Sequence, residues 1–335
     1  MDKENLVGIY CITYNHKSYI RDCLEGFVKQ KTNFKFKAVV FDDCSTDGTR
    51  EIVEEYAKKY PDIIKPILPE HNVAQSKGFD FVAKAIYDNL NTKYVAYCEG
   101  DDYWTDENKL QKQVDFLEAH PEYSGCFHPV KIHWENGEEK DSIYPKPQKI
   151  RGKKFVTAGD LLEYNYIQTN SVLYRWAFID KDFKEFFPEK ILPGDLYMHL
   201  LHAKRGNIGF LPEVMSVYRR QRGGIWFNNP RLKYGKEIVK FYYEVWKNIT
   251  DSSEDYLHDK FLPALKESAD VFYKNGKLEE LKELQDTYGE YFEKALSDRG
   301  GNPKKDIKYK KLFNITLIIS VIELILLIIL MCSSL

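Results

Sequence analysis

The sequence lacks an excess of basic residues, and this absence excludes one large class of proteins. Its 335 residues include 49 Lys and Arg against 51 Asp and Glu, which gives a net charge of −2. Nucleic-acid binders normally carry a marked basic excess, so we expect no nucleic-acid partner. The six cysteines are widely spread and form no Cys-x-x-Cys pair. We therefore expect reduced core thiols rather than a disulfide framework or a zinc site.

A signal peptide is also lacking, but the C-terminal region contains one long apolar run. Residues 312–332 carry a single charge, Glu323, and 21 residues can cross a hydrocarbon core of about 30 Å as a helix. Five lysines in the segment 301–311 precede the run. The positive-inside rule then predicts a single-pass membrane protein with a C-terminal anchor and a cytoplasmic N-terminal part. A buried core helix is the alternative, and the role of Glu323 stays open.

Short apolar runs alternate with helical patterns along the first hundred residues. Strands are expected at 6–12, 38–41, 63–68 and 94–98, and helices at 19–30, 49–60 and 75–90. This order predicts an α/β fold with a mostly parallel central sheet and helices on both of its faces. From about residue 230 to residue 297 the pattern is helical, which predicts two or three further helices.

Acidic residues follow two of the expected strands. Asp42 and Asp43 end the second strand, and Glu99, Asp101 and Asp102 end the fourth. In a doubly wound sheet, ligands bind beyond the carboxyl ends of the strands. Clustered carboxylates repel one another unless a cation lies among them, and Mg²⁺ or Mn²⁺ bound together with phosphate oxygens would satisfy such a cluster. A solvated acidic turn is the alternative.

The spacing within the second acidic cluster adds to this prediction. Glu99 and Asp101 are two residues apart, so in extended backbone their side chains point to the same side. Gly100 lies between them and would let the backbone approach a ligand closely.

Several segments resemble the family 2 glycosyltransferases of the GT-A fold. They are CITYNH (11–16), VVFDDCSTDGT (39–49) and YCEGDDYWTDENKLQKQVDFLEAHPEYSGCFH (97–128), the last being similar to the subgroup that carries EGDDYW. Downstream, PGDLYMHLLHAKRGNIGFLPEVMSVYRR (193–220) and GGIW (223–226) resemble the acceptor side of the same family. The resemblance covers about residues 5–227. It implies a GT-A nucleotide-sugar-binding fold and an inverting transfer from a UDP-, GDP- or dTDP-sugar.

The resemblance also implies roles for individual residues. Asp43 falls on the position that reads the nucleotide base, and the backbone pocket around it comprises Ile12, Tyr14 and Asn15. Glu99-Gly100-Asp101 takes the place of the metal-binding motif. Because Glu99 replaces an aspartate and could hold the ribose or a water molecule, Asp101 is the safer metal ligand. Asp102 follows it, as in many relatives.

Asp195 matches the general base of the family. An acceptor hydroxyl is a poor nucleophile until a positioned carboxylate takes its proton. From the sequence alone, Asp195 is equally plausible as the N-cap of the helix that follows it.

The chain departs from the family in two places. Gln221 stands where many relatives have a histidine that helps to hold the metal or the diphosphate, so the resemblance implies donor binding and leaves metal dependence open. Arg219 and Arg220 are candidates for gripping phosphate instead. In the second place, a glycine-and-arginine loop of the relatives is replaced by residues 70–78. Lys77 could contact phosphate there, or it could be a solvated lysine.

Three other functions are alternatives for a chain with these carboxylates. A nucleotidyltransferase usually has a glycine-rich phosphate loop after its first strand, and residues 11–18 contain no glycine. A glycoside hydrolase would need paired carboxylates but no nucleotide pocket. An inactive scaffold or sugar-nucleotide sensor would not need Asp43, Asp101 and Asp195 intact.

The resemblance and the residue patterns together predict four regions. They are a GT-A catalytic domain (1–227), a helical extension (228–300), a basic juxtamembrane linker (301–311) and a transmembrane helix (312–332). The membrane prediction suggests a glycan or lipid-linked acceptor. The helices at 231–297 are candidates for shaping the acceptor site or for forming a homo-oligomer.

Overall fold

The structure, a computed structural model, describes residues 5–297 apart from residues 136, 138, 179, 180, 182 and 222–228. The chain divides into two compact units, Met1–Gly224 and Ile225–Leu335. The first unit contains both β-sheets, and the second unit is helical where it is described. The functional division into regions 1–227, 228–300, 301–311 and 312–332 stays a prediction.

Within the described residues, the larger sheet has the strand order β3-β2-β1-β4-β10-β6-β11-β9. Its strands are β1 (Val7–Thr13), β2 (Phe36–Asp42), β3 (Ile64–Ile67), β4 (Tyr94–Tyr97), β6 (Gly125–Phe127), β9 (Phe155–Val156), β10 (Leu173–Arg175) and β11 (Ile208–Phe210). The four strands predicted from the sequence are β1 to β4, and they pair in parallel. The rest of the sheet is mixed, because β10 pairs antiparallel with both β4 and β6.

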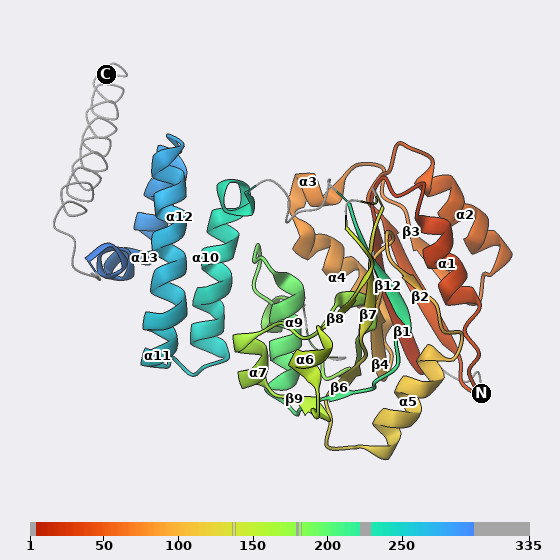
Figure 1. Ribbon diagram of the computed structural model, residues 1–335. Helices are drawn as coiled ribbons and strands as arrows, with labels where there is room; N and C mark the ends of the chain where they lie inside the picture. The colour runs from red at the N-terminus through yellow and green to blue at the C-terminus, as the bar shows by residue number, and fades with distance from the viewer. Residues whose placement is uncertain are drawn as a thin grey trace. The chain divides into compact units, whose positions relative to one another are not determined.

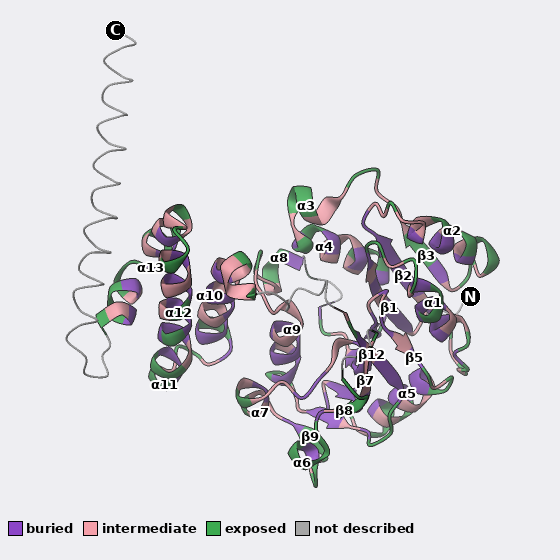
Figure 2. Ribbon diagram, turned by 45° about the horizontal axis from the view of Figure 1, so that its top comes forward, coloured by how far each residue is buried: buried purple, intermediate pink, exposed green. Residues whose placement is uncertain are grey.

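Helices cover the parallel half of this sheet on both faces, as predicted. The helices α1 (Ile20–Val28) and α2 (Thr49–Lys59) lie on one face and α4 (Phe79–Leu90) lies on the other (Figure 1). Burial is concentrated on the strands between these layers (Figure 2). Such strands are buried on both sides, which is why they read as continuous apolar runs in the sequence.

The predicted helix 75–90 is two helices, α3 (Val73–Lys77) and α4. Gly78 separates them with a φ of +103°, a conformation that breaks a helix and that glycine adopts readily.

A smaller sheet has the strand order β5-β12-β7-β8. Its strands are β5 (Tyr103–Trp104), β7 (Val130–Trp134), β8 (Ser142–Tyr144) and β12 (Ser216–Arg220). The pairing of β12 with β5 joins segments that are more than a hundred positions apart in the chain. It places β12 next to residues 99–102, which we call the acidic turn. The remaining helices of this unit are α5 (Lys109–Ala119), α6 (Pro147–Ile150), α7 (Ala158–Glu163), η1 (Thr169–Ser171), α8 (Phe183–Phe186) and α9 (Gly194–Ala203).

The second unit consists of helices around an aromatic core. They are α10 (Pro230–Asn248), α11 (Glu254–Tyr256), the π-helical turn η2 (Leu257–Phe261), α12 (Leu262–Lys274) and α13 (Leu278–Ser297). Trp246 stacks on Phe261 at 5.8 Å between ring centroids, and Tyr288 meets Phe261 edge-on at 5.6 Å. Aromatic pairs at such distances contribute beyond the area they bury.

The predicted membrane localisation is corrected by the structure. No helix in the described part of the chain combines the length and the apolar character needed to cross a bilayer. The prediction of a single-pass membrane protein with a C-terminal anchor and a cytoplasmic catalytic domain is corrected accordingly, because the described residues contain no such anchor. The predicted segments 301–311 and 312–332, including Glu323, lie outside the described residues.

Candidate functional site

The site begins where β1 and β4 end side by side. The backbone N–H of Gly100 donates to the carbonyl oxygen of Ile12 at 2.9 Å. A Cβ atom on Gly100 would lie 2.4 Å from Oγ1 and 2.5 Å from Cβ of Thr13. Glycine is therefore needed here because the turn packs against Thr13, a physical reason different from the close ligand approach expected from the sequence.

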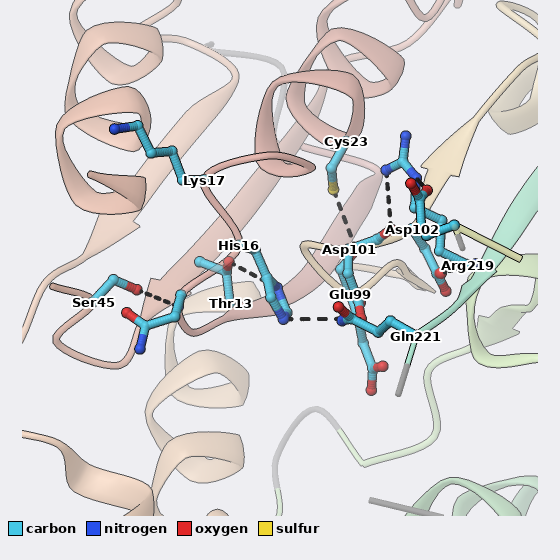
Figure 3. Close-up of polar contacts among 12 residues, drawn as sticks. Thr13, His16, Lys17, Cys23, Ser45, Glu99, Asp101, Asp102, Arg219 and Gln221 are labelled. Carbon is cyan, nitrogen blue, oxygen red and sulfur yellow. Dashed lines mark hydrogen bonds and ion pairs between the residues drawn. The ribbon is translucent and has the colours of Figure 1, made fainter. Parts of the chain in front are cut away.

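The carboxylate of Asp101 lies near two polar side chains, His16 and Gln221 (Figure 3). Gln221 Nε2 donates to Asp101 Oδ2 at 3.1 Å, and His16 Nε2 lies 3.9 Å from the same oxygen. The side chains of His16 and Asp101 are 19% and 20% exposed, so both are accessible to a ligand.

Asp102 is placed differently from Asp101. It is buried, and its Oδ1 accepts a 2.9 Å hydrogen bond from the backbone N–H of Arg219. Burial, followed by the nearby charge of Asp101, raises the pKa of Asp102 well above its ordinary value. Through these contacts the Asp102 carboxyl joins the acidic turn to β12, and its role as a metal ligand stays a prediction.

Arg219 also joins these two segments. Its guanidinium forms ion pairs with Asp22 and with Glu135, the latter at 2.7 Å, and it donates to the carbonyl oxygen of Asp101 at 3.0 Å. It also lies over the ring of Tyr103 at 4.3 Å. Only 7% of the Arg219 side chain is exposed, and its guanidinium contacts other residues of the protein instead of solvent. The exposed Arg220 lies over the ring of Trp134 at 5.3 Å.

Glu99 links the acidic turn to Asp195. Burial is the largest cause that raises the pKa of Glu99 from 4.5 to about 8, and the negative charges of Asp101 and Asp195 add to the increase. These two residues lie 94 positions apart in the chain, yet both act electrostatically on the same carboxyl. The acidic turn and the start of α9 therefore face a common region.

Asp195 lies in the first turn of α9. The N-cap of this helix is Pro193, so Asp195 is not the N-cap residue considered from the sequence. Its Oδ1 accepts from the backbone N–H of Leu196 at 2.8 Å, and its Oδ2 accepts from Thr169 Oγ1 at 3.4 Å. A carboxylate at this end of a helix is stabilised by the helix dipole.

Asp43 is held by the start of α3. Its two carboxylate oxygens accept backbone N–H groups of Val73 at 2.6 Å and of Ala74 at 3.0 Å. Asn72 Nδ2 donates to the carbonyl oxygen of Asp43 at 3.1 Å. Asp43 is 2% exposed, so it fixes α3 against the end of β2.

The other predicted donor residues lie at the rim of this region. Asn15 has a φ of +54°, and its side-chain oxygen accepts from the backbone of Thr46 at 2.9 Å. Tyr14 is 46% exposed. Lys77 is exposed at the end of α3, with its Nζ 5.9 Å from the centre of the Phe81 ring.

The residues present fit a divalent cation only in part. Within the described residues, no group of three or more His, Cys, Asp or Glu side chains is arranged to hold a metal ion. Mg²⁺ and Mn²⁺ sites often use one or two protein oxygens together with substrate phosphates. The accessible Asp101 and its neighbour Gln221 fit that smaller requirement.

Two contributors to the site were missed in the sequence. His16 lies within the quoted motif CITYNH but received no role, although a polar residue just after a strand end is a recognisable signal. Asp22, on the exposed side of α1, gave no signal, because its partner Arg219 is 197 residues away in the chain.

Most of the first unit matches a known protein family. A family model described as Glycosyl transferase family 2 matches residues 9–180, slightly more than half of the chain. An uncharacterized protein of Mycobacterium tuberculosis is 43% identical over 220 residues, which are 66% of this chain and 60% of that relative. The chain thus spans about three-fifths of the length of this relative.

TarS of Staphylococcus aureus, a poly(ribitol-phosphate) beta-N-acetylglucosaminyltransferase, is 29% identical over 63% of this chain and 35% of its own length. Its solved structure, residues 1–349 with UDP-GlcNAc, has a TM-score of 0.55 at 21% identity and covers 88% of this chain and 80% of that one.

A second solved structure has the same fold. The mannosyltransferase PcManGT of Pyrobaculum calidifontis, with GDP-Man and Mn²⁺, has a TM-score of 0.52 at 16% identity and covers 93% of this chain and 80% of its own. At these identities the two structures establish the fold alone, and they confirm the predicted GT-A-like α/β architecture with C-terminal helices. The match of the family model to residues 9–180 identifies the chain as a member of glycosyl transferase family 2.

Proposed function

We propose that the chain is an inverting glycosyltransferase that moves a sugar from a nucleoside-diphosphate sugar to a hydroxyl group of a glycan. The observation that carries this proposal is that two carboxylates 94 positions apart in the chain, Asp101 and Asp195, both act electrostatically on the carboxyl of Glu99. The negative charges of Asp101 and Asp195 both raise the pKa of Glu99. The acidic turn, where the donor would bind, and the candidate base Asp195 therefore face one region. The EGDDYW sequence at residues 99–104 supports placement in the subgroup with that motif.

In this mechanism Asp195 takes the proton of the acceptor hydroxyl as its oxygen attacks the anomeric carbon. The 2.8 Å hydrogen bond from Leu196 N–H occupies Oδ1, and the 3.4 Å contact with Thr169 leaves Oδ2 the less engaged oxygen. Attack from the side opposite the leaving diphosphate inverts the anomeric configuration. Holding the two reactants in line supplies a large part of the rate through orientation.

Without a bound cation, the pKa of Glu99 is about 8, so its carboxyl is predominantly protonated at neutral pH. A neutral carboxyl donates a hydrogen bond to a sugar or ribose oxygen without adding charge beside the diphosphate. A divalent cation, Mn²⁺ or Mg²⁺, would be held by Asp101 and Gln221 and would neutralise charge that develops on the diphosphate. The PcManGT complex with GDP-Man and Mn²⁺ supports this cofactor.

For the donor we propose a UDP-, GDP- or dTDP-sugar. The TarS complex with UDP-GlcNAc and the PcManGT complex with GDP-Man support a nucleoside diphosphate in this fold. Asp43, Ile12, Tyr14 and Asn15 would surround the base. Because Asp43 engages α3 through both of its carboxylate oxygens, base recognition would involve the position of α3 as well.

For the acceptor we propose a glycan polymer. The name of TarS, which modifies poly(ribitol-phosphate), supports a polymeric acceptor for a related chain. The helical unit Ile225–Leu335 is a candidate for acceptor binding or for self-association.

A binding screen followed by a transfer assay tests the proposal. The purified chain is heated with UDP, GDP or dTDP, each with Mn²⁺ or with EDTA. We expect one nucleotide to stabilise the fold by about 2.7 kcal/mol at one hundred times its Kd. The matching sugar donors are then tested for transfer, and NMR of the product should show an inverted anomeric centre. Absence of binding by every nucleotide would contradict the proposal, and binding without turnover would favour a sugar-nucleotide sensor.

A further inference from the structure

We propose that His16 is a nitrogen ligand of the divalent cation, acting beside Asp101 and compensating for the glutamine at position 221. This inference rests on the proposed function, because the remaining ligands would be oxygens of the donor diphosphate. His16 was not singled out by its sequence motif, and its role is inferred from where its ring lies.

The His16 ring is oriented by a hydrogen bond from one of its two nitrogens. Its Nδ1 forms a 3.2 Å hydrogen bond with Thr13 Oγ1, and its Nε2 lies on the side of Asp101 (Figure 3). Histidines that bind metals almost always use their second nitrogen in such a hydrogen bond, which fixes the ring and its tautomer. The packing of Gly100 against Thr13 holds this arrangement at the end of β1.

The distance between His16 Nε2 and Asp101 Oδ2 suits two ligands of one ion. The 3.9 Å between His16 Nε2 and Asp101 Oδ2 is too long for a direct hydrogen bond. Two ligand atoms that each lie about 2.1 Å from one ion are separated by about 3.0 Å when adjacent and by up to about 4.2 Å when opposite. A single ion can therefore bridge these two atoms without a large movement of either side chain.

The side chain of Gln221 lies at the same carboxylate oxygen of Asp101. Its Nε2 lies 3.1 Å from the same Asp101 oxygen, which is close to the separation of two adjacent ligands in an octahedral site. Rotation of the amide by half a turn would present its carbonyl oxygen, a ligand that hard cations accept. Gln221 can thus supply an oxygen but no ring nitrogen. His16 supplies that nitrogen from the turn after β1 instead of from the position after β12.

This ligand set has a consequence for metal choice. Imidazole nitrogen binds transition-metal ions in preference to Mg²⁺, which prefers oxygen. The chain should therefore bind Mn²⁺ more tightly than Mg²⁺, and the difference should depend on His16.

Electron spin-echo spectroscopy of bound Mn²⁺ tests the inference directly. Mn²⁺ is added to the full chain alone and with UDP, GDP or dTDP in turn, and modulation from ¹⁴N nuclei is recorded. We expect ¹⁴N modulation in the wild type with the nucleotide that binds, and a changed modulation when histidine is labelled with ¹⁵N. The variant His16→Gln should lose the signal and bind Mn²⁺ about tenfold more weakly, with a smaller change for Mg²⁺.

The matched control is His120→Gln. His120 is 43% exposed, pairs with Glu122 at 3.1 Å and lies at the end of α5, so its loss should change neither the signal nor the affinity. Nucleotide binding with Mn²⁺ but without ¹⁴N modulation, or modulation that persists in His16→Gln, would overturn this inference alone. Nucleotide binding without bound Mn²⁺ would overturn it as well. Failure of all three nucleotides to bind would overturn the proposed function together with it.

Discussion

The guanidinium of Arg219 donates a 3.0 Å hydrogen bond to the carbonyl oxygen of Asp101, across 118 positions of the chain. The same group pairs with Glu135 and Asp22, and the backbone N–H of Arg219 donates to Asp102. Arg219 therefore holds the backbone of the acidic turn, and through it the direction in which the Asp101 carboxylate points. We infer that it positions the site and is not itself a contact for the donor.

Substitution of Arg219 should lower both the free energy of unfolding and the affinity for the donor. Arg219→Ala leaves Glu135 without its partner and frees the acidic turn, so we expect the free energy of unfolding to fall by about 2–4 kcal/mol. Arg220→Ala is the matched control, with an expected loss below about 1 kcal/mol because the side chain is exposed. Urea denaturation of both variants measures the difference, and equal losses would contradict the positioning role.

The contact between Gly100 and Thr13 predicts a second stability effect. A methyl group on Gly100 would lie 2.4 Å from Thr13 Oγ1 and 3.1 Å from His16 Nδ1, so Gly100→Ala should destabilise the fold by about 1–3 kcal/mol. Gly159→Ala serves as control, since a Cβ there meets only Thr157 Oγ1 at 3.6 Å within α7. Alanine favours helix by up to about 1 kcal/mol, so this control should be neutral or stabilising. A neutral Gly100→Ala would show that the turn can move away from Thr13.

The raised pKa of Glu99 predicts a pH-dependent stability. Between pH 4.5 and about 8 the folded protein keeps a proton on Glu99 that the unfolded chain has lost. The contribution of this group to stability therefore falls as the pH rises through that window and is constant above it. Glu99→Gln removes the titration. Its free energy of unfolding, relative to the wild type, should rise by about 4 kcal/mol between pH 5 and pH 8.5, without nucleotide and in EDTA. A difference that does not change with pH would refute the raised pKa.

The carboxylate of Asp43 predicts a local effect on α3. Asp43→Asn keeps the shape of the side chain but directs an amide donor at one of the two backbone N–H groups, which leaves that group unsatisfied. We expect a loss of about 1–3 kcal/mol and faster hydrogen exchange at Val73 and Ala74. Asp88→Asn, at an exposed position on α4, should change neither quantity. Unchanged exchange at both amides would contradict the assigned contacts.

The sequence predicted those parts of the fold that local pattern determines. The strands β1, β2 and β4 are buried on both faces, so their apolar runs stand out in the sequence. The acidic residues after β2 and β4 gather at one edge because parallel strands run in the same direction. The break at Gly78 was missed because one glycine does not interrupt a helical pattern of apolar residues on either side.

The contacts of the site residues could not be predicted in the same way. Arg219 was expected to bind phosphate, and its pairing with Asp22 and Glu135 arises from the return of β12 alongside β5 and β7. Gly100 was expected to approach a ligand, and in the structure the atom that it approaches is Thr13 Oγ1 on β1. Such relationships depend on tertiary packing between segments far apart in the chain, which residue types and spacing do not encode.

The central claim is that Asp195 acts as base on an acceptor in the region that Asp101 and Glu99 also face. The most direct test is the turnover of Asp195→Asn with the donor that the binding screen identifies, measured together with its donor Kd. The account predicts that kcat falls by about 10²–10⁴ while the Kd changes less than about threefold, because the amide keeps the shape but cannot take a proton. Unchanged turnover with an intact donor site would contradict it.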